Sequence, residues 1–173
     1  MIFVENGNGC GVILTRTFID LQGLARSKMN ITEKLYIVIV RCELVAQRCS
    51  GYFCEKAFHE RSGGFAAYPK ELAYRTLYIT CGGCCGRALQ RKLSHLARRI
   101  RQKEQIGKEQ IVVQLSSCIT RDNHHGPPCP HLDYIKTLVR RMNIDLREDT
   151  RISPKAEERR KAGEYADRSG CSE

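Results

Sequence analysis

Three short apolar runs constrain the fold of this chain more than any other feature, because each resembles a buried strand and each precedes a helical pattern. The runs are residues 35–40, 75–80 and 110–115, and the helical patterns that follow them are residues 52–60, 87–104 and 132–142. Runs rich in β-branched residues without polar alternation are typical of parallel strands covered on both faces. The chain therefore alternates strand and helix three times.

This alternation predicts the fold class. A weaker apolar segment, Ile144–Leu146, follows the third helical pattern and indicates a short fourth strand at a sheet edge. Strands that alternate with helices form parallel sheets with helices on both faces, and right-handed crossovers leave few possible strand orders. We therefore predict a three-layer α/β fold with a mostly parallel four-stranded sheet, flavodoxin-like or Rossmann-like.

Cysteines follow all three apolar runs. Cys42, Cys81 and Cys118 lie where the three predicted strands end. Ligands of open parallel sheets bind beyond the carboxyl ends of the strands, so we expect these thiols to converge at one rim. The loops that follow add further candidate ligands, which are Cys49, Cys54, Cys84, Cys129 and His131.

The second strand ends in a distinctive stretch, Cys81–Cys84, in which two glycines separate two thiols just before a helix. Thiols near the unpaired N–H groups of a helix start have a lowered pKa, which favours both metal ligation and nucleophilic attack. The glycines allow the backbone to turn tightly beside whatever the sulfurs hold.

Two chemistries remain open for these residues. Thiolates with one imidazole suit zinc or, alternatively, an iron–sulfur cluster, so we predict a cysteine-rich metal-binding protein whose biochemical role stays open. The alternative is a thiol–disulfide oxidoreductase in which Cys81 attacks a disulfide and Cys84 or Cys85 resolves the intermediate. Residue spacing alone does not decide whether the protein is an enzyme.

Composition limits the setting in which the chain works. It has 173 residues, ten cysteines and a net charge of +10. It lacks an apolar run of membrane-spanning length and a signal-peptide pattern, so we expect a cytoplasmic protein that makes no membrane contact. In the cytosol, clustered cysteines usually serve metal binding or catalysis. The basic residues of 87–104 have no aromatic residues among them, so we expect a solvated helix face rather than a nucleic-acid partner.

We divide the chain into three parts. Residues 1–30 differ from the rest and are predicted to be a dispensable N-terminal extension. Residues 31–152 hold all the strand and helix patterns and form the predicted α/β domain. Residues 153–173 are highly charged with both signs and form a tail.

Taken in order, the cysteine motifs resemble those of the CGGC-domain family over about residues 34–151. They are Arg41–Cys42, Cys49, Cys54, Thr80–Cys84, Ser117–Ile119 and Cys129–His131. The resemblance implies a metal-binding domain, with zinc as the expected metal. Relatives usually have proline where Cys85 stands, and a Gly-Thr-His ending near the last strand where this chain has Asp149–Arg151.

Overall fold

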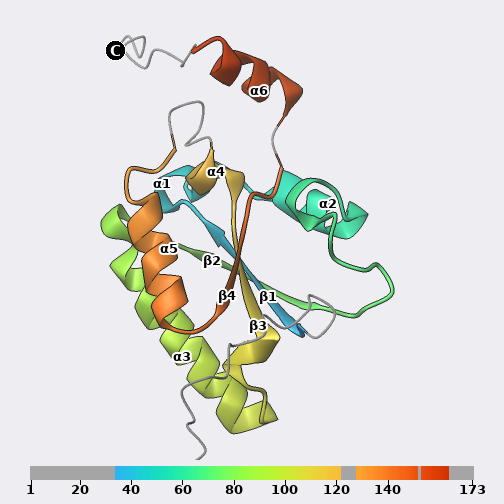
Figure 1. The fold of residues 1–173 in the computed structure, drawn as a ribbon, viewed down its shortest axis with the longest axis vertical. Coiled ribbons are helices and arrows are strands. Elements are labelled where there is room, and N and C mark those ends of the chain that lie inside the picture. Colours follow the sequence, from blue (N-terminus) through green and yellow to red (C-terminus); the bar gives the residue numbers. More distant parts are fainter. Residues whose placement is uncertain (1–33, 122–127, 152, 164–173) are drawn as a thin grey trace, which may run out of the picture.

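The computed structural model describes residues 34–121, 128–151 and 153–163, and a four-stranded parallel sheet forms its centre (Figure 1). The strands are β1 (Tyr36–Arg41), β2 (Arg75–Thr80), β3 (Ile111–Leu115) and β4 (Asp145–Glu148). Their order in the sheet is β2-β1-β3-β4, and all neighbouring pairs are parallel. This is the flavodoxin-like order, which confirms the predicted fold class.

Helices cover both faces of the sheet. The α-helices are α1 (Glu43–Ala46), α2 (Tyr52–Glu60), α3 (Arg87–Glu104), α4 (Ser117–Thr120), α5 (Leu132–Arg141) and α6 (Pro154–Lys161). The 3-10 helices are η2 (Gly63–Phe65), η3 (Cys84–Gly86) and η4 (Lys108–Gln110). Helices α3 and α5 lie on one face and α2 on the other, giving the three predicted layers (Figure 1).

The central strand β1 is continuously apolar because it is buried on both faces. Tyr36, Val38 and Val40 pack into the core beneath α3 and α5. Ile37 and Ile39 point to the opposite face and pack with the aromatic residues near α2. Burying one such aliphatic side chain stabilises the fold by about 1.5–3 kcal/mol, so this strand anchors both cores.

Two four-residue helices were not expected from the sequence. Helix α1 begins directly after β1, and α4 begins directly after β3. Neither is long enough to show an apolar periodicity, which needs several turns to be read. Their position matters, because both begin where the strand-end cysteines Cys42 and Cys118 lie.

Several predicted segments fall outside the described residues. The N-terminal extension of residues 1–30 is among them, and so is the end of the charged tail, residues 164–173. The described part of the tail contains α6, which lies beyond the end of the sheet to which the strands point (Figure 1). Within the residues described, no helix combines the length and apolar character needed to cross a membrane.

Candidate thiol centre

The register of the sheet brings the strand-end cysteines to one rim. Arg41 of β1 pairs with Thr80 of β2, so the next residues, Cys42 and Cys81, continue side by side. The Cys81 N–H donates to the Arg41 carbonyl at 2.9 Å, which extends this pairing past the strand end. On the other side of β1, the Ser116 N–H donates to the Val40 carbonyl at 2.9 Å. Cys118 therefore follows beside Cys42.

Backbone amides join the three thiols. Cys42 has extended backbone angles and precedes the first turn of α1. Its N–H points to the Cys118 sulfur, with 3.3 Å between N and Sγ. The next N–H, that of Glu43, points to the Cys81 sulfur at 3.4 Å. Donors directed at sulfur favour its thiolate form, so the turn from β1 into α1 is suited to holding negatively charged sulfur.

The Cys42 and Cys81 thiols interact directly in a site that is largely closed to solvent. Both side chains are buried, and Cys118 is half-buried against the same core. The hydrogen bond from Cys81, helped by the N–H groups of Val45 and Leu44, lowers the pKa of Cys42 from 9.0 to about 6. The same hydrogen bond, together with burial, raises the pKa of Cys81.

Burial also raises the pKa of Cys118, to about 11. Of the three thiols, Cys42 is therefore the one that ionises near neutral pH, with Cys81 as its hydrogen-bond donor. This differs from the predicted oxidoreductase, in which Cys81 was the attacking thiol. The physical reason is that the Cys81 thiol donates a hydrogen bond to Cys42, helped by N–H groups at the start of α1. The register of β1 and β2 places the two thiols side by side.

The remaining predicted ligands lie around this group rather than in it. The Cys54 sulfur is 3.3 Å from the Thr150 hydroxyl, and Cys49 is exposed beyond α1. Cys129 is half-buried and its N–H donates to the Ile119 carbonyl at 3.0 Å. His131 is half-buried at the start of α5. The side chain of Cys84 is outside the described part of the chain.

The donor set fits a thiophilic metal in its chemistry. Cys42, Cys81 and Cys118 offer three sulfur atoms with backbone donors directed at two of them, and soft thiolates select zinc or iron–sulfur clusters. Among the described side chains, however, no three Cys, His, Asp or Glu groups are arranged as a ready metal site. The thiols are near one another without surrounding a common point.

Sequence reasoning missed two hydroxyl residues that support the rim. Thr150 is buried, and its N–H donates to the Ser117 hydroxyl at 2.9 Å. The Ser117 N–H in turn points to the Thr150 hydroxyl at 3.3 Å. The sequence signal for Thr150 as a rim residue was weak, because Thr150 follows the short strand β4. Its position at the end of a fourth strand was the available clue that it belongs to the rim.

Arg151 occupies the position at which the resemblance led us to expect a histidine. Its guanidinium lies over the Phe53 ring, 4.7 Å from the ring centroid. This contact links the end of β4 to the first turn of α2. The side chain is a cation and supplies no metal ligand there.

The fold and the rim together define a cysteine-rich α/β domain with thiols at the carboxyl ends of parallel strands. The family model of the CGGC domain matches residues 36–150, from the first residue of β1 to Thr150. The chain therefore belongs to the CGGC-domain family. Metal binding is the role ascribed to this domain, which leaves the metal and its ligands unspecified. Neither the curated proteins nor the solved structures gave a match.

Proposed function

We propose that this protein binds a thiophilic metal, with zinc as the first choice, through Cys42, Cys81 and Cys118. The observation that carries the proposal is the convergence of these three sulfurs around one strand-to-helix turn, with backbone N–H groups directed at two of them. A fourth ligand is drawn from the other predicted residues, which are Cys49, Cys54, Cys84, Cys129 and His131.

Zinc is preferred because it accepts mixed sulfur and nitrogen ligands in tetrahedral geometry. An iron–sulfur cluster is the alternative, since clusters are also held by thiolates. Bound zinc would supply Lewis acidity in an open site or structural support in a closed one. The chain's own contribution is to keep Cys42 deprotonated and to shield the sulfurs, since Cys42 and Cys81 are only 6% and 5% exposed.

The test is metal content and visible absorption of protein purified without oxygen and without a histidine tag. Stoichiometric zinc in a colourless sample is expected, and brown protein with iron and sulfide would favour the cluster. Cys42→Ser and Cys118→Ser should both abolish the bound metal. Cys85→Ser is the matched control, because this neighbouring cysteine is outside the proposed ligand set. Wild-type protein without metal after anaerobic purification contradicts the proposal.

A second candidate, thiol–disulfide exchange, is favoured by the hydrogen bond from Cys81 to Cys42. The Cys42 thiolate attacks a disulfide substrate, forming a mixed disulfide and releasing one substrate thiolate. Cys81 then loses its proton and attacks the Cys42 sulfur, releasing the second thiolate. The products are a reduced substrate and a Cys42–Cys81 disulfide.

A trapping experiment separates the two candidates. Incubation with glutathione disulfide should leave one glutathione on Cys42 in the Cys81→Ser variant, since no resolving thiol remains beside it. Peptide mass spectrometry locates the adduct. The Cys85→Ser variant should resolve the adduct as wild type does. Absence of an adduct on Cys42 excludes exchange at this pair while leaving the metal proposal intact.

A further inference from the structure

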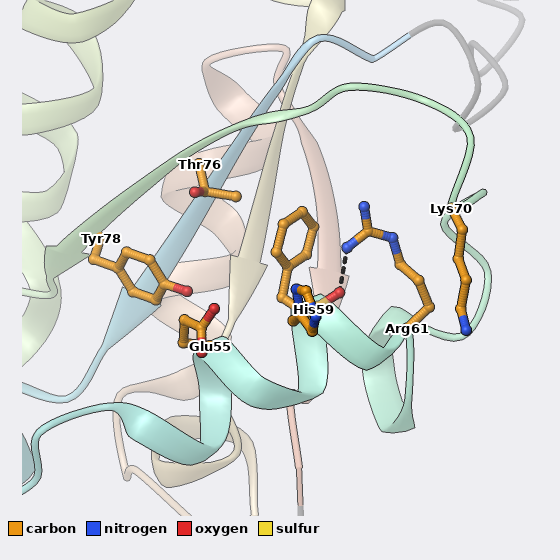
Figure 2. Close-up of a pocket in the computed structure, with 7 residues that line it drawn as sticks. Glu55, His59, Arg61, Lys70, Thr76 and Tyr78 are labelled. Atoms are coloured by element: carbon orange, nitrogen blue, oxygen red, sulfur yellow. Dashed lines mark hydrogen bonds between the residues drawn. The ribbon is translucent and has the colours of Figure 1, made fainter.

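A cavity on the α2 face of the sheet holds none of the thiols discussed above. It has a volume of about 510 Å³ and lies between α2 and the edge strand β2 (Figure 2). Its lining residues are Glu55, Phe58, His59, Arg61, Lys70, Thr76 and Tyr78. The volume falls within the range of sites that bind small molecules, about 300–1,000 Å³.

Charges of opposite sign stand at the two ends of this cavity. Glu55 and the Tyr78 hydroxyl lie near each other at one end, and Arg61 and Lys70 lie at the other (Figure 2). Burial, with Glu55 close by, raises the pKa of Tyr78 to about 12, so its hydroxyl remains a hydrogen-bond donor. The cavity is therefore dipolar rather than uniformly basic.

The charged groups of this cavity are not neutralised by ion pairs among the described residues. Within the described part of the chain, no ion pair involves Glu55, Arg61 or Lys70. Other residues of the same types do form ion pairs, including Lys56 with Glu60 on the same helix at 3.1 Å. Opposite charges that face one cavity without meeting are suited to a ligand that carries both.

The cationic end is held in a fixed position. The Arg61 guanidinium lies 4.0 Å from the centroid of the Phe58 ring and 5.5 Å from that of Tyr74. It also donates to the Phe58 carbonyl (Figure 2). Such contacts reduce the entropy lost when a ligand binds, because the side chain is already ordered.

One wall of the cavity is apolar. Phe58 lines it, and the Phe58 ring is fixed by edge-on contacts with Phe65 and Tyr74. His59 and Thr76 complete the lining between the charged residues (Figure 2). Glu55 lies within α2 and Arg61 directly follows its last residue, Glu60. The two charges are therefore spaced along the helix instead of lying beside each other (Figure 2).

We propose that this cavity binds a small zwitterion of the ω-amino acid class, with its carboxylate at Arg61 and Lys70 and its ammonium at Glu55 and Tyr78. The methylene spacer lies against Phe58.

The experiment is calorimetric titration of the full chain with 5-aminopentanoate, beside pentanoate and pentylamine as probes that lack one charge each. The zwitterion is expected to bind at least about tenfold more tightly than either probe, because each probe leaves one charged end of the cavity without its partner. Equal affinity for pentanoate or for pentylamine, or absence of binding, would each overturn the proposal.

Variants locate the binding site. Glu55→Gln and Lys70→Gln exchange exposed side chains, so both should fold, and each should weaken 5-aminopentanoate binding about tenfold. Arg98→Gln on α3 is the control, because it removes an exposed charge far from the cavity. Binding that is unchanged in both cavity variants, or equally weakened in the control, contradicts this location. The readout does not involve the thiols, so it is independent of metal content.

Discussion

At the scale of single residues, Cys42 has the most unusual environment in the rim. It follows the central strand and receives a hydrogen bond from the Cys81 thiol and N–H groups from the start of α1. The hydrogen bond to Cys42, together with burial, raises the pKa of Cys81, and burial raises the pKa of Cys118. One rim thus contains thiols shifted in opposite directions, a pattern that is common at functional sites.

We expect this difference to be visible in a pH titration of the reduced, metal-free protein. Thiolate absorbance near 240 nm should rise with a midpoint near pH 6 in the wild type, and Cys42→Ser should lack this step. Cys81→Ala should move the step to higher pH, because it removes the hydrogen bond that is the largest cause of the lowered pKa of Cys42. A step at pH 6 that survives in Cys42→Ser contradicts the assignment.

The same shift predicts how stability depends on pH. Because the pKa of Cys42 is lower in the folded state than its ordinary 9.0, the folded state favours the thiolate. This stabilisation is fully present above pH 9 and is lost as the pH falls through 6. The difference in unfolding free energy between wild type and Cys42→Ser should therefore shrink from pH 9 to pH 6 in urea titrations. If this difference grows as the pH falls from 9 to 6, the folded state favours the protonated thiol of Cys42, which contradicts the prediction.

At the scale of elements, the start of α3 depends on close contact with α5. Gly86 precedes α3 with a φ of 69°, and a Cβ there would lie 2.7 Å from Ile135 Cγ1. Gly86→Ala should therefore destabilise the protein by about 2–4 kcal/mol, combining left-handed strain with overpacking. Gly163→Ala is the matched control, since its φ is 70° and nothing lies within 4 Å of the added Cβ. Similar urea midpoints for both variants would contradict the contact.

A buried polar network ties β3 to the end of β4. Gln114 is fully buried and accepts a hydrogen bond from the Tyr68 hydroxyl at 2.8 Å. Its amide donates to the Glu148 carbonyl at 3.0 Å and to the Asp149 carbonyl. The hydrogen-bonding groups of the Gln114 side chain therefore find their partners in two other parts of the chain, at Tyr68 and at the end of β4.

Replacing Gln114 should cost more than replacing its partner. Gln114→Leu leaves the Tyr68 hydroxyl and the Glu148 carbonyl without this partner, and should lower the unfolding free energy by about 2–4 kcal/mol. Tyr68→Phe removes one hydroxyl and should cost about 1–3 kcal/mol. Chemical denaturation of both variants measures the difference. A larger cost for Tyr68→Phe would show that ring packing, rather than the network, dominates.

At the scale of the whole molecule, the family match covers residues 36–150 and includes the whole sheet, which runs from Tyr36 to Glu148. Helix α6 follows this part, and its ion pair between Glu157 and Arg121, at 3.9 Å, is of an exposed kind worth a few tenths of a kcal/mol. We expect a chain of residues 31–152 to unfold at nearly the same temperature as the full protein. Calorimetry of both chains tests this, and a midpoint several degrees lower would show that the outer segments contribute to stability.

The fold was predictable because its main signals are local. The continuous apolar run of β1 and the stripe of Leu89 and Leu93 in α3 both follow from periodicity. The site was less predictable, because the pairing of Cys42 with Cys81 depends on register between strands far apart in sequence. The role of Thr150 was hidden for the same reason, since its partner Ser117 lies at another strand end.

The distance in sequence between the rim cysteines also sets the order of events while the chain is being made. Cys42, Cys81 and Cys118 meet only after β1 has paired with β2 and β3, whereas Cys81 and Cys84 are neighbours in the nascent chain. Closing a short loop costs less entropy than closing a long one. A metal ion or oxidant that arrives before the sheet forms will therefore meet the local pair first, so loading of the proposed rim site requires a chain that has already folded.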